Sequence, residues 1–159
     1  MEEAECDISV LEELGGTPHI IKMHERWKWE NINLSLIVLD YKQRSIFQPR
    51  NGCQLGHFAY QARGNFYHLT LMLQALDCLH ANKVVHADIK PDNIIVEPSG
   101  CVTLIDFGLA VEGFFYEARG KIGTTPYIAP EVINGERITC KADMWSFGIL
   151  LFEKVIIKL

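Results

Sequence analysis

Apolar residues recur every three or four positions in two stretches of this chain, which is the spacing of one face of a helix. The first stretch, residues 2–14, stops at the pair Gly15 and Gly16, and the second covers residues 66–82. A third stretch, residues 141–159, is apolar on nearly every side, so a helix there is expected to be buried all round. Helices are therefore predicted over all three stretches.

Shorter apolar runs predict strands. Residues 20–21, 26–30 and 34–39 form such runs, and the last is apolar enough for a central strand. Residues 94–96 and 101–105 are predicted to pair as a hairpin, because Glu97-Pro98-Ser99-Gly100 between them is a turn sequence. The stretch from residue 43 to 65 is rich in turn residues, and Gly56 and Gly64 are expected to keep it irregular until the next helix.

Composition and charge narrow the class of protein. The 159 residues are 48% hydrophobic and 22% charged, which is enough for one core and excludes a disordered tail. A net charge of -5 without clustered Lys and Arg argues against nucleic acid or a membrane surface as the main partner. The acidic start of the chain and the absence of a membrane-length apolar run predict an intracellular protein, cytoplasmic or nuclear. The scattered cysteines predict reduced thiols.

Residues able to do chemistry gather between positions 86 and 108. His86-Ala87-Asp88-Ile89-Lys90-Pro91-Asp92-Asn93 precedes the predicted hairpin, and Asp106-Phe107-Gly108 follows it. Phosphoryl transfer needs an oxygen acceptor that orients the attacking hydroxyl, hard oxygen ligands for magnesium, and a cation that balances the spread-out charge. Asp88 suits the first role, Asn93 with Asp106 the second, and Lys90 the third.

This stretch resembles the catalytic loop and the metal-binding turn of eukaryotic protein kinases, whose pattern is H-R-D-L-x-x-x-N followed by D-F-G. Residues 123–131, Gly-Thr-Thr-Pro-Tyr-Ile-Ala-Pro-Glu, are similar to the substrate-facing loop of that family, which ends in A-P-E. Residues 143–148, Asp-Met-Trp-Ser-Phe-Gly, resemble the start of its buried central helix. The resemblance implies an α+β, protein-kinase-like fold: a remnant of the small lobe, a sheet plus one helix, in 1–40, and the hinge and core of a mostly helical, truncated large lobe in 41–159.

The function that the resemblance implies is a serine/threonine protein kinase, which transfers the γ-phosphate of ATP, with Mg²⁺, to a Ser or Thr hydroxyl of a protein substrate. Lys90, two residues after Asp88, is typical of members that act on serine and threonine. A pseudokinase-like interaction module or an inactive fragment stays open as the alternative, because the Gly-rich loop and a strand lysine are expected before residue 1. If the apolar C-terminal helix is left exposed, a protein partner is expected to cover it.

The same resemblance gives individual residues their roles. Catalysis is assigned to Asp88, Lys90, Asn93 and Asp106, and metal binding to Asn93 and Asp106. ATP binding is assigned to Leu39, to the backbone of Asp40 and Lys42 at the hinge, and to Lys90, Ile95, Ile105 and Asp106. The resemblance also assigns supporting roles. Asp7 stands where the family has a glutamate that pairs with a lysine, His86 is expected to pack on Phe107, and Gly108 is expected in the metal-binding turn. Thr124 is expected beside Asp88 and Lys90, Asp143 is expected to anchor the catalytic loop, and Glu131 belongs to the same supporting set. Asp7 as a solvated helix residue is an equal alternative.

Ala87 is the main departure from the family pattern. Many kinases have an arginine there that binds a phosphate on the activation loop. The position expected to accept that phosphate is Gly120 in this chain. Because both halves of the switch are missing, any activity is predicted not to depend on phosphorylation of residues 109–122. His80 is predicted to be a packed histidine at the end of a helix, and Asp92 a loop carboxylate.

Overall fold

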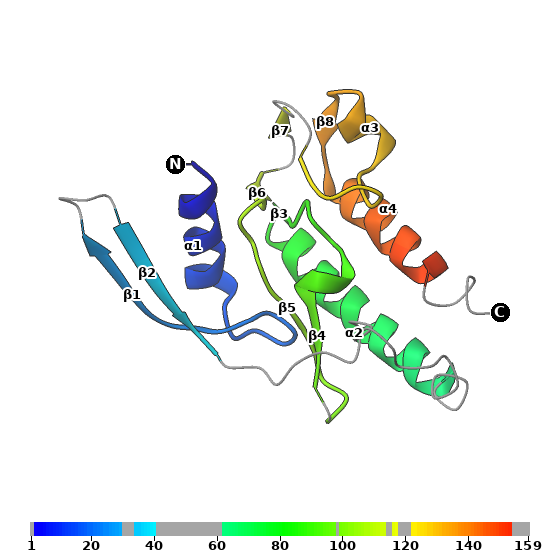
Figure 1. Ribbon diagram of the computed structural model, residues 1–159, viewed down its shortest axis with the longest axis horizontal. Helices are drawn as coiled ribbons and strands as arrows, with labels where there is room; N and C mark the ends of the chain where they lie inside the picture. Colours follow the sequence, from blue (N-terminus) through cyan, green and yellow to red (C-terminus); the bar gives the residue numbers. More distant parts are fainter. Residues whose placement is uncertain are drawn as a thin grey trace.

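A computed structural model of the chain describes residues 2–29, 34–40, 62–97, 99–113, 116–117 and 122–153. Helix α1 (Glu2–Leu14) and the strands β1 (Met23–Trp29) and β2 (Leu34–Leu39) lie on one side of the molecule (Figure 1). The long helix α2 (Ala62–Ala81) and helix α4 (Cys140–Leu151) lie on the other side. The strands that carry the candidate site lie between these two groups.

Helix α1 has the bounds that its apolar stripe predicts. Ile8, Leu11 and Leu14 are buried, and the amide of Gly15 still donates to Leu11 O at 3.1 Å. Gly16 then has a φ of +83°, a conformation that glycine adopts without strain and that ends helices. The helix therefore ends where the glycine pair predicts.

Strands β1 and β2 form an antiparallel pair, in the register Arg26↔Ile37 and Trp27↔Leu36. The prediction of a central strand over 34–39 is wrong for the part of the chain that the structure describes, where β2 has β1 as its single neighbour. Leu39, at the end of β2, is 40% exposed. An apolar run does not by itself reveal how many strands will flank it.

The predicted strand at 20–21 is reduced to one bridge, in which Ile20 pairs in parallel with Leu104. Two backbone hydrogen bonds hold it: Ile21 N donates to Leu104 O at 3.0 Å, and Leu104 N donates to His19 O at 2.7 Å. The connection that follows α1 is thereby fixed to the strand that leads to Asp106.

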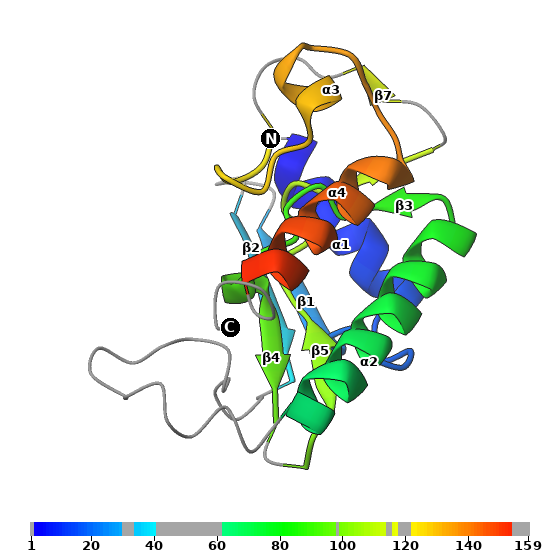
Figure 2. The ribbon, with the colours of Figure 1, turned by 90° about the vertical axis from the view of Figure 1, so that its right-hand side faces the viewer.

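The hairpin after the candidate loop consists of β4 (Ile94–Val96) and β5 (Val102–Leu104), antiparallel with Ile95 opposite Thr103. Figure 2 shows this pair running alongside α2. Helix α2 begins before the predicted residue 66, so Gly64 lies inside it and the expected irregular backbone there is wrong. One glycine costs a helix only about 1 kcal/mol relative to alanine, which a buried apolar stripe offsets.

Several short elements complete the described chain. Strand β3 (Val84–Val85) pairs with β6 (Val111–Glu112), and β7 (Tyr116–Glu117) pairs with β8 (Arg137–Ile138). The 3-10 turn η4 is Pro91–Asn93, and helix α3 is Pro130–Ile133. None of the helices in the described ranges is both long and apolar enough to cross a membrane.

Helix α4 is packed on one face only. Ala142, Phe147 and Leu150 are buried, whereas Met144 and Trp145 are 43% and 46% exposed. The prediction of a helix buried all round is therefore wrong for this chain, because the described elements cover one side of it. Phe152, just beyond the helix, is 52% exposed.

The buried side chains form two clusters on either side of the candidate loop. The larger cluster joins α1, α2, β4, β5 and α4 around side chains that include Met72, Leu79, Leu104 and Phe107. The smaller one joins Val85, Val111, Ala129, Val132, Ile138 and Ala142. Residues 86–93 run between them, so packing restrains this loop from both sides.

Candidate active site

The loop from His86 to Asn93 is largely buried although it carries polar side chains. His86, Asp88 and Asn93 are 0%, 6% and 3% exposed. Ala87 has a φ of +63°, which turns the backbone sharply between His86 and Asp88. Buried polar groups require hydrogen-bond partners, and these partners define the site.

Asp88 is the centre of the hydrogen-bond network. Its Oδ2 accepts from Lys90 Nζ at 2.6 Å and from Asn93 Nδ2 at 3.1 Å, and its Oδ1 accepts from the Thr124 hydroxyl at 2.7 Å. Burial raises the pKa of the Asp88 carboxyl, but the hydrogen bonds from Lys90, Thr124 and Asn93 and the charge of Lys90 outweigh it, so that pKa lies below its ordinary value. Asp88 is therefore an ionised acceptor at neutral pH.

Lys90 joins the loop to the segment that contains Thr124. Besides its contact with Asp88, Lys90 Nζ donates to Thr124 Oγ1 at 2.9 Å. An ammonium, a carboxylate and a hydroxyl thus meet in one triangle, formed by residues from two separate segments. The sequence resemblance predicts these partners for Thr124, and the structure contains both contacts.

Asn93 and Asp106 lie at neighbouring strand ends. Ile105 N donates to Asn93 O at 3.0 Å, so Asp106 directly follows the residue that is paired with Asn93. The Asn93 side chain uses Nδ2 for its bonds to Asp88, to Oδ2 and to the backbone O at 2.9 Å, which leaves its Oδ1 for an external ligand. Asp106 is exposed, with a φ of +63°, and its Oδ1 accepts from Gly108 N at 3.4 Å.

This pair of oxygens suits a hard cation. Mg²⁺ in nucleotide sites takes one or two protein oxygens, and the substrate phosphates and water supply the others. Among the described residues, no group of three or more His, Cys, Asp or Glu side chains could hold a metal by itself. A carboxylate and an amide oxygen would therefore suit Mg²⁺ that takes its other ligands from phosphate and water better than they would suit an all-protein metal cage.

His86 is enclosed by the loop that it helps to shape. Its ring lies on Phe107, with centroids 4.9 Å apart, and its Nε2 donates to Ile105 O at 3.2 Å. Asp88 N donates to its Nδ1 at 3.3 Å, which assigns the proton of a neutral ring to Nε2. Because both ring nitrogens are used by the backbone, His86 orients the loop and is not a free base.

Asp143, in the first turn of α4, is fully buried and binds two consecutive amides of the loop. His86 N donates to Oδ2 and Ala87 N donates to Oδ1, both at 2.9 Å. His80 Nε2 also donates to Oδ2, at 2.8 Å. The sequence predicts no partner for His80, because its spacing fits a helix stripe and Asp143 is 63 positions away.

The segment of residues 123–131 is anchored on α4. Ser146 Oγ donates to Tyr127 O at 2.7 Å, and Tyr127 OH donates to Glu153 Oε2 at 2.8 Å. Burial and, after it, the hydrogen bond to Glu153 raise the pKa of the Tyr127 hydroxyl. Local spacing gives no signal for these bonds, which join segments that are distant in sequence.

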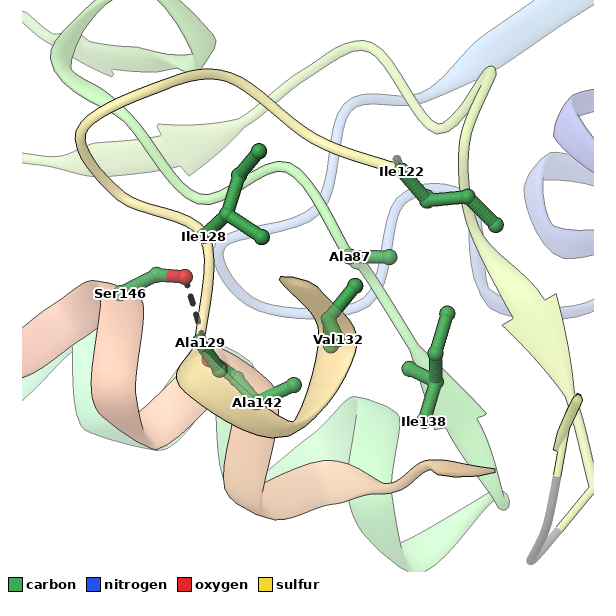
Figure 3. A pocket seen from close by; sticks show the side chains of 8 residues that line it. All are labelled: Ala87, Ile122, Ile128, Ala129, Val132, Ile138, Ala142 and Ser146. Carbon is green, nitrogen blue, oxygen red and sulfur yellow. Dashed lines mark hydrogen bonds between the residues drawn. The ribbon is translucent and has the colours of Figure 1, made fainter. Parts of the chain in front are cut away.

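Ala87 lies at a small pocket lined mostly by apolar residues (Figure 3). The other lining residues come from the segment after residue 121, α3, β8 and α4: Ile122, Ile128, Ala129, Val132, Ile138, Ala142 and Ser146. At Gly123 a Cβ would lie only 2.9 Å from Ala87 O, so the segment approaches the loop too closely for any other residue. The segment that contains Gly123 therefore packs closely against the loop at Ala87, through apolar side chains and a short approach of the two backbones.

The residues assigned to nucleotide binding are only partly described. Leu39 and Asp40 lie at the end of β2, where the side chains of His24 and Asp40 are paired. Ile95 in β4 is half-buried, and Ile105 is half-buried against the larger core. Lys42 and the side chain of Asp7 lie outside the described residues. Glu131 is half-buried in α3, and its backbone O accepts from Glu136 N at 2.8 Å.

Comparison with known proteins supports the resemblance seen in the sequence. Residues 2–159 match the family described as "Protein kinase domain". The chain is 33% identical over 138 residues to ribosomal protein S6 kinase alpha-3 of Homo sapiens, covering 86% of this chain and 18% of that protein. It is 39% identical over 138 residues to ribosomal protein S6 kinase alpha-1 of Rattus norvegicus, with the same coverage.

A third relative is protein kinase C delta type of Rattus norvegicus, 32% identical over 140 residues, which are 80% of this chain and 21% of that protein. The matched stretch thus spans about a fifth of the length of these relatives. The family match extends over nearly the whole sequence, and the fold agrees with it. The chain therefore belongs to the protein kinase family.

Proposed function

We propose that this chain carries the phosphoryl-transfer site of a protein serine/threonine kinase. The observation that supports the proposal most is the triangle of Asp88, Lys90 and Thr124. It places an ionised acceptor and a cation around a hydroxyl, at 2.6–2.9 Å. Phosphoryl transfer depends mainly on such positioning and on balancing charge.

The residues divide the work as follows. Asp88 accepts a hydrogen bond from the attacking hydroxyl of the substrate and orients it, and Lys90 balances negative charge on the transferred group. Asn93 and Asp106 would hold Mg²⁺, which when bound neutralises charge on the phosphates of ATP. Leu39, the backbone of Asp40 and Lys42, Ile95 and Ile105 would form the adenine site.

Two further features belong to the proposal. A serine or threonine acceptor is favoured because Lys90 has the position typical of such kinases and already contacts a threonine hydroxyl. Residues 1–40 would contribute to the small lobe, and residues 41–159 to the hinge and large lobe. Activity without phosphorylation of residues 109–122 is expected, because Ala87 offers no cation to bind a phosphate.

The test is Mg²⁺-dependent transfer of labelled γ-phosphate from ATP to a serine-containing peptide by the purified chain. Asp88→Asn should lower kcat by roughly 100-fold or more, because an amide cannot accept the proton. Asp106→Asn should abolish Mg²⁺-dependent ATP binding. Asp77→Asn, an exposed carboxylate on α2, is the matched control and should match the unaltered chain. Equal activity in Asp88→Asn and the control would contradict the proposal.

A non-catalytic interaction module is the second candidate. It is favoured by one observation, the exposed apolar side chains Met144, Trp145 and Phe152 on and beside α4. The same assay separates the two candidates. A folded chain that neither binds ATP with Mg²⁺ nor transfers phosphate in any variant would favour the module.

A further inference from the structure

We propose that His24 is a positioning residue for the hinge, acting through Asp40. His24 lies in β1, and Asp40 directly follows the last residue of β2. Nε2 of His24 is paired with Oδ1 of Asp40, although the two residues are 16 positions apart in the sequence. The effect on nucleotide affinity rests on the proposed function, in which the backbone of Asp40 contacts adenine, whereas the effect on the geometry of Asp40 does not.

Strand β1 carries one extra residue at the point where it meets the end of β2. The register of the two strands passes from Met23↔Leu39 to Glu25↔Val38. His24 therefore faces no residue of β2 in the described pairing. Such an extra residue, a β-bulge, interrupts the regular alternation of side chains and can turn a side chain in a new direction. Here the ring of the extra residue lies beside Asp40.

Asp40 is attached to this side of the sheet twice. Its backbone N donates to Lys22 O at 2.9 Å, and its carboxylate is paired with the ring of His24. A carboxylate only accepts hydrogen bonds, so Nε2 carries the proton of this contact whether the ring is neutral or charged. The backbone bond alone permits rotation of Asp40 about it, whereas the added side-chain bond restricts that rotation. The pair with His24 therefore limits the orientations of the peptide groups at Asp40.

Backbone contacts to a base depend on the orientation of the peptide groups that make them. A hydrogen bond weakens steeply when its angle at the hydrogen falls below about 120°. A backbone that is already restricted also loses less conformational freedom when the nucleotide binds, which raises affinity. The side chains of His24 and Asp40 are 44% and 34% exposed, and exposed pairs contribute little to the stability of a fold. The expected effect of losing the pair is therefore a modest loss of affinity for ATP, with the fold retained.

The experiment is amide hydrogen exchange by NMR on the full chain, with His24→Ala and His24→Gln. Glutamine keeps a nitrogen donor, whereas alanine has none. Glu25→Ala is the matched control, because Glu25 is the next residue of β1 and is also exposed. Exchange at Asp40 N reports on the hinge. Exchange at Leu104 N, which donates to the backbone at 2.7 Å in another part of the fold, reports on global folding.

We expect His24→Ala to speed exchange at Asp40 N by about 2-fold to 5-fold and to leave exchange at Leu104 N unchanged. His24→Gln and Glu25→Ala should exchange like the unaltered chain. Unchanged exchange at Asp40 N in His24→Ala, or an equal change in Glu25→Ala, would overturn the proposal. Faster exchange at both amides, or a His24→Ala chain that no longer folds, would show a role in the whole fold and would also overturn it.

A second readout separates affinity from transfer. His24→Ala should raise KM for ATP by about 2-fold to 5-fold with kcat unchanged, and His24→Gln should restore most of the affinity. Asp40→Ala should raise KM at least as much, and adding His24→Ala to it should change KM no further, because both changes remove one contact. Additive effects, or a lowered kcat with unchanged KM, would contradict action through Asp40. Absence of ATP binding and transfer in every chain, the unaltered one included, would contradict the proposed function, and the exchange data would still decide the role of His24.

Discussion

The neighbours of Asp88 keep its buried carboxylate in the ionised form. Burial alone would favour its neutral form, yet three donors from Lys90, Asn93 and Thr124 surround it. Hydrogen bonds to the charged form lower a pKa. A buried carboxylate that stays charged is a strong acceptor, which is the property that the proposed transfer to a hydroxyl requires.

Thr124→Val tests the hydroxyl of this triangle. The change keeps shape but removes the donor to Asp88 Oδ1, and valine cannot accept from Lys90. We expect the free energy of unfolding to fall by about 1–3 kcal/mol, because a charged group loses a partner. Thr125→Val, at the exposed neighbouring position, should change it by less than about 0.5 kcal/mol. Urea unfolding measures the free energy of unfolding of both variants. Equal losses in the two would contradict a stabilising role for the Thr124 hydroxyl.

The pH dependence of stability tests the charge of Asp88. Its pKa in the folded chain lies below the ordinary value, so the folded state favours the ionised form. The resulting stability is fully present above the pKa of the unfolded chain, about 4, and is lost as pH falls through the lower pKa of the folded chain. The difference in unfolding free energy between the unaltered chain and Asp88→Asn should therefore shrink below about pH 4. A difference that grows on acidification would contradict this sign.

At the scale of elements, the sequence predicts best where a local signal ends or begins a structure. The pair Gly15 and Gly16 fixes the end of α1, and the turn at 97–100 fixes the β4–β5 hairpin. Elements made by distant pairing are missed: β3 with β6 and β7 with β8 have two residues each and no periodicity. How much of α4 is covered cannot be predicted from its own residues either, since it depends on what packs there.

Some residues of the candidate site can likewise be recognised from the sequence, and others cannot. Motif residues such as Asp88, Lys90 and Asn93 are recognisable because their spacing along the chain is short and their chemistry is distinctive. The bonds of His80 to Asp143 and of Tyr127 to Glu153 are not, because each joins two elements whose contact only the fold creates. Side chains that support a site are therefore harder to find from sequence than those that form it.

The approach of residues 123–131 to the loop of residues 86–93 can be tested at Gly123. Alanine there meets a φ of +105° and also Ala87 O at 2.9 Å from its Cβ. Gly113 has a similar φ of +103° with nothing within 4 Å, so Gly113→Ala isolates the cost of the backbone conformation. We expect Gly113→Ala to cost about 1–2 kcal/mol, and Gly123→Ala roughly 1–3 kcal/mol more. Thermal unfolding measures the difference, and equal losses would show that the segment can move away.

For the molecule as a whole, the balance of buried and exposed apolar surface is uneven. The larger cluster unites elements from α1 to α4, whereas Met144, Trp145 and Phe152 remain exposed in the described chain. Exposed apolar surface of this kind promotes association. The solution behaviour of the chain should therefore be sensitive to substitutions on this side of α4.

Trp145→Lys tests that sensitivity. The side chain is 46% exposed, so lysine should reduce self-association at high concentration while changing the free energy of unfolding by less than about 1 kcal/mol. Light scattering against concentration measures the first effect, and urea unfolding the second. Phe147→Lys, on the buried face of the same helix, should instead unfold the chain. Unchanged scattering by Trp145→Lys would show that this surface does not drive association.

The position of residues 86–93 between two apolar clusters has a consequence for cooperativity. Loosening either cluster would release one flank of the loop, so catalytic competence should be lost before the chain as a whole melts. A conservative truncation such as Ile138→Val, remote from the acceptor carboxylate, would then affect turnover more steeply than it affects the melting temperature. In that case each of the two clusters would be needed separately to hold residues 86–93 in the conformation that transfer requires.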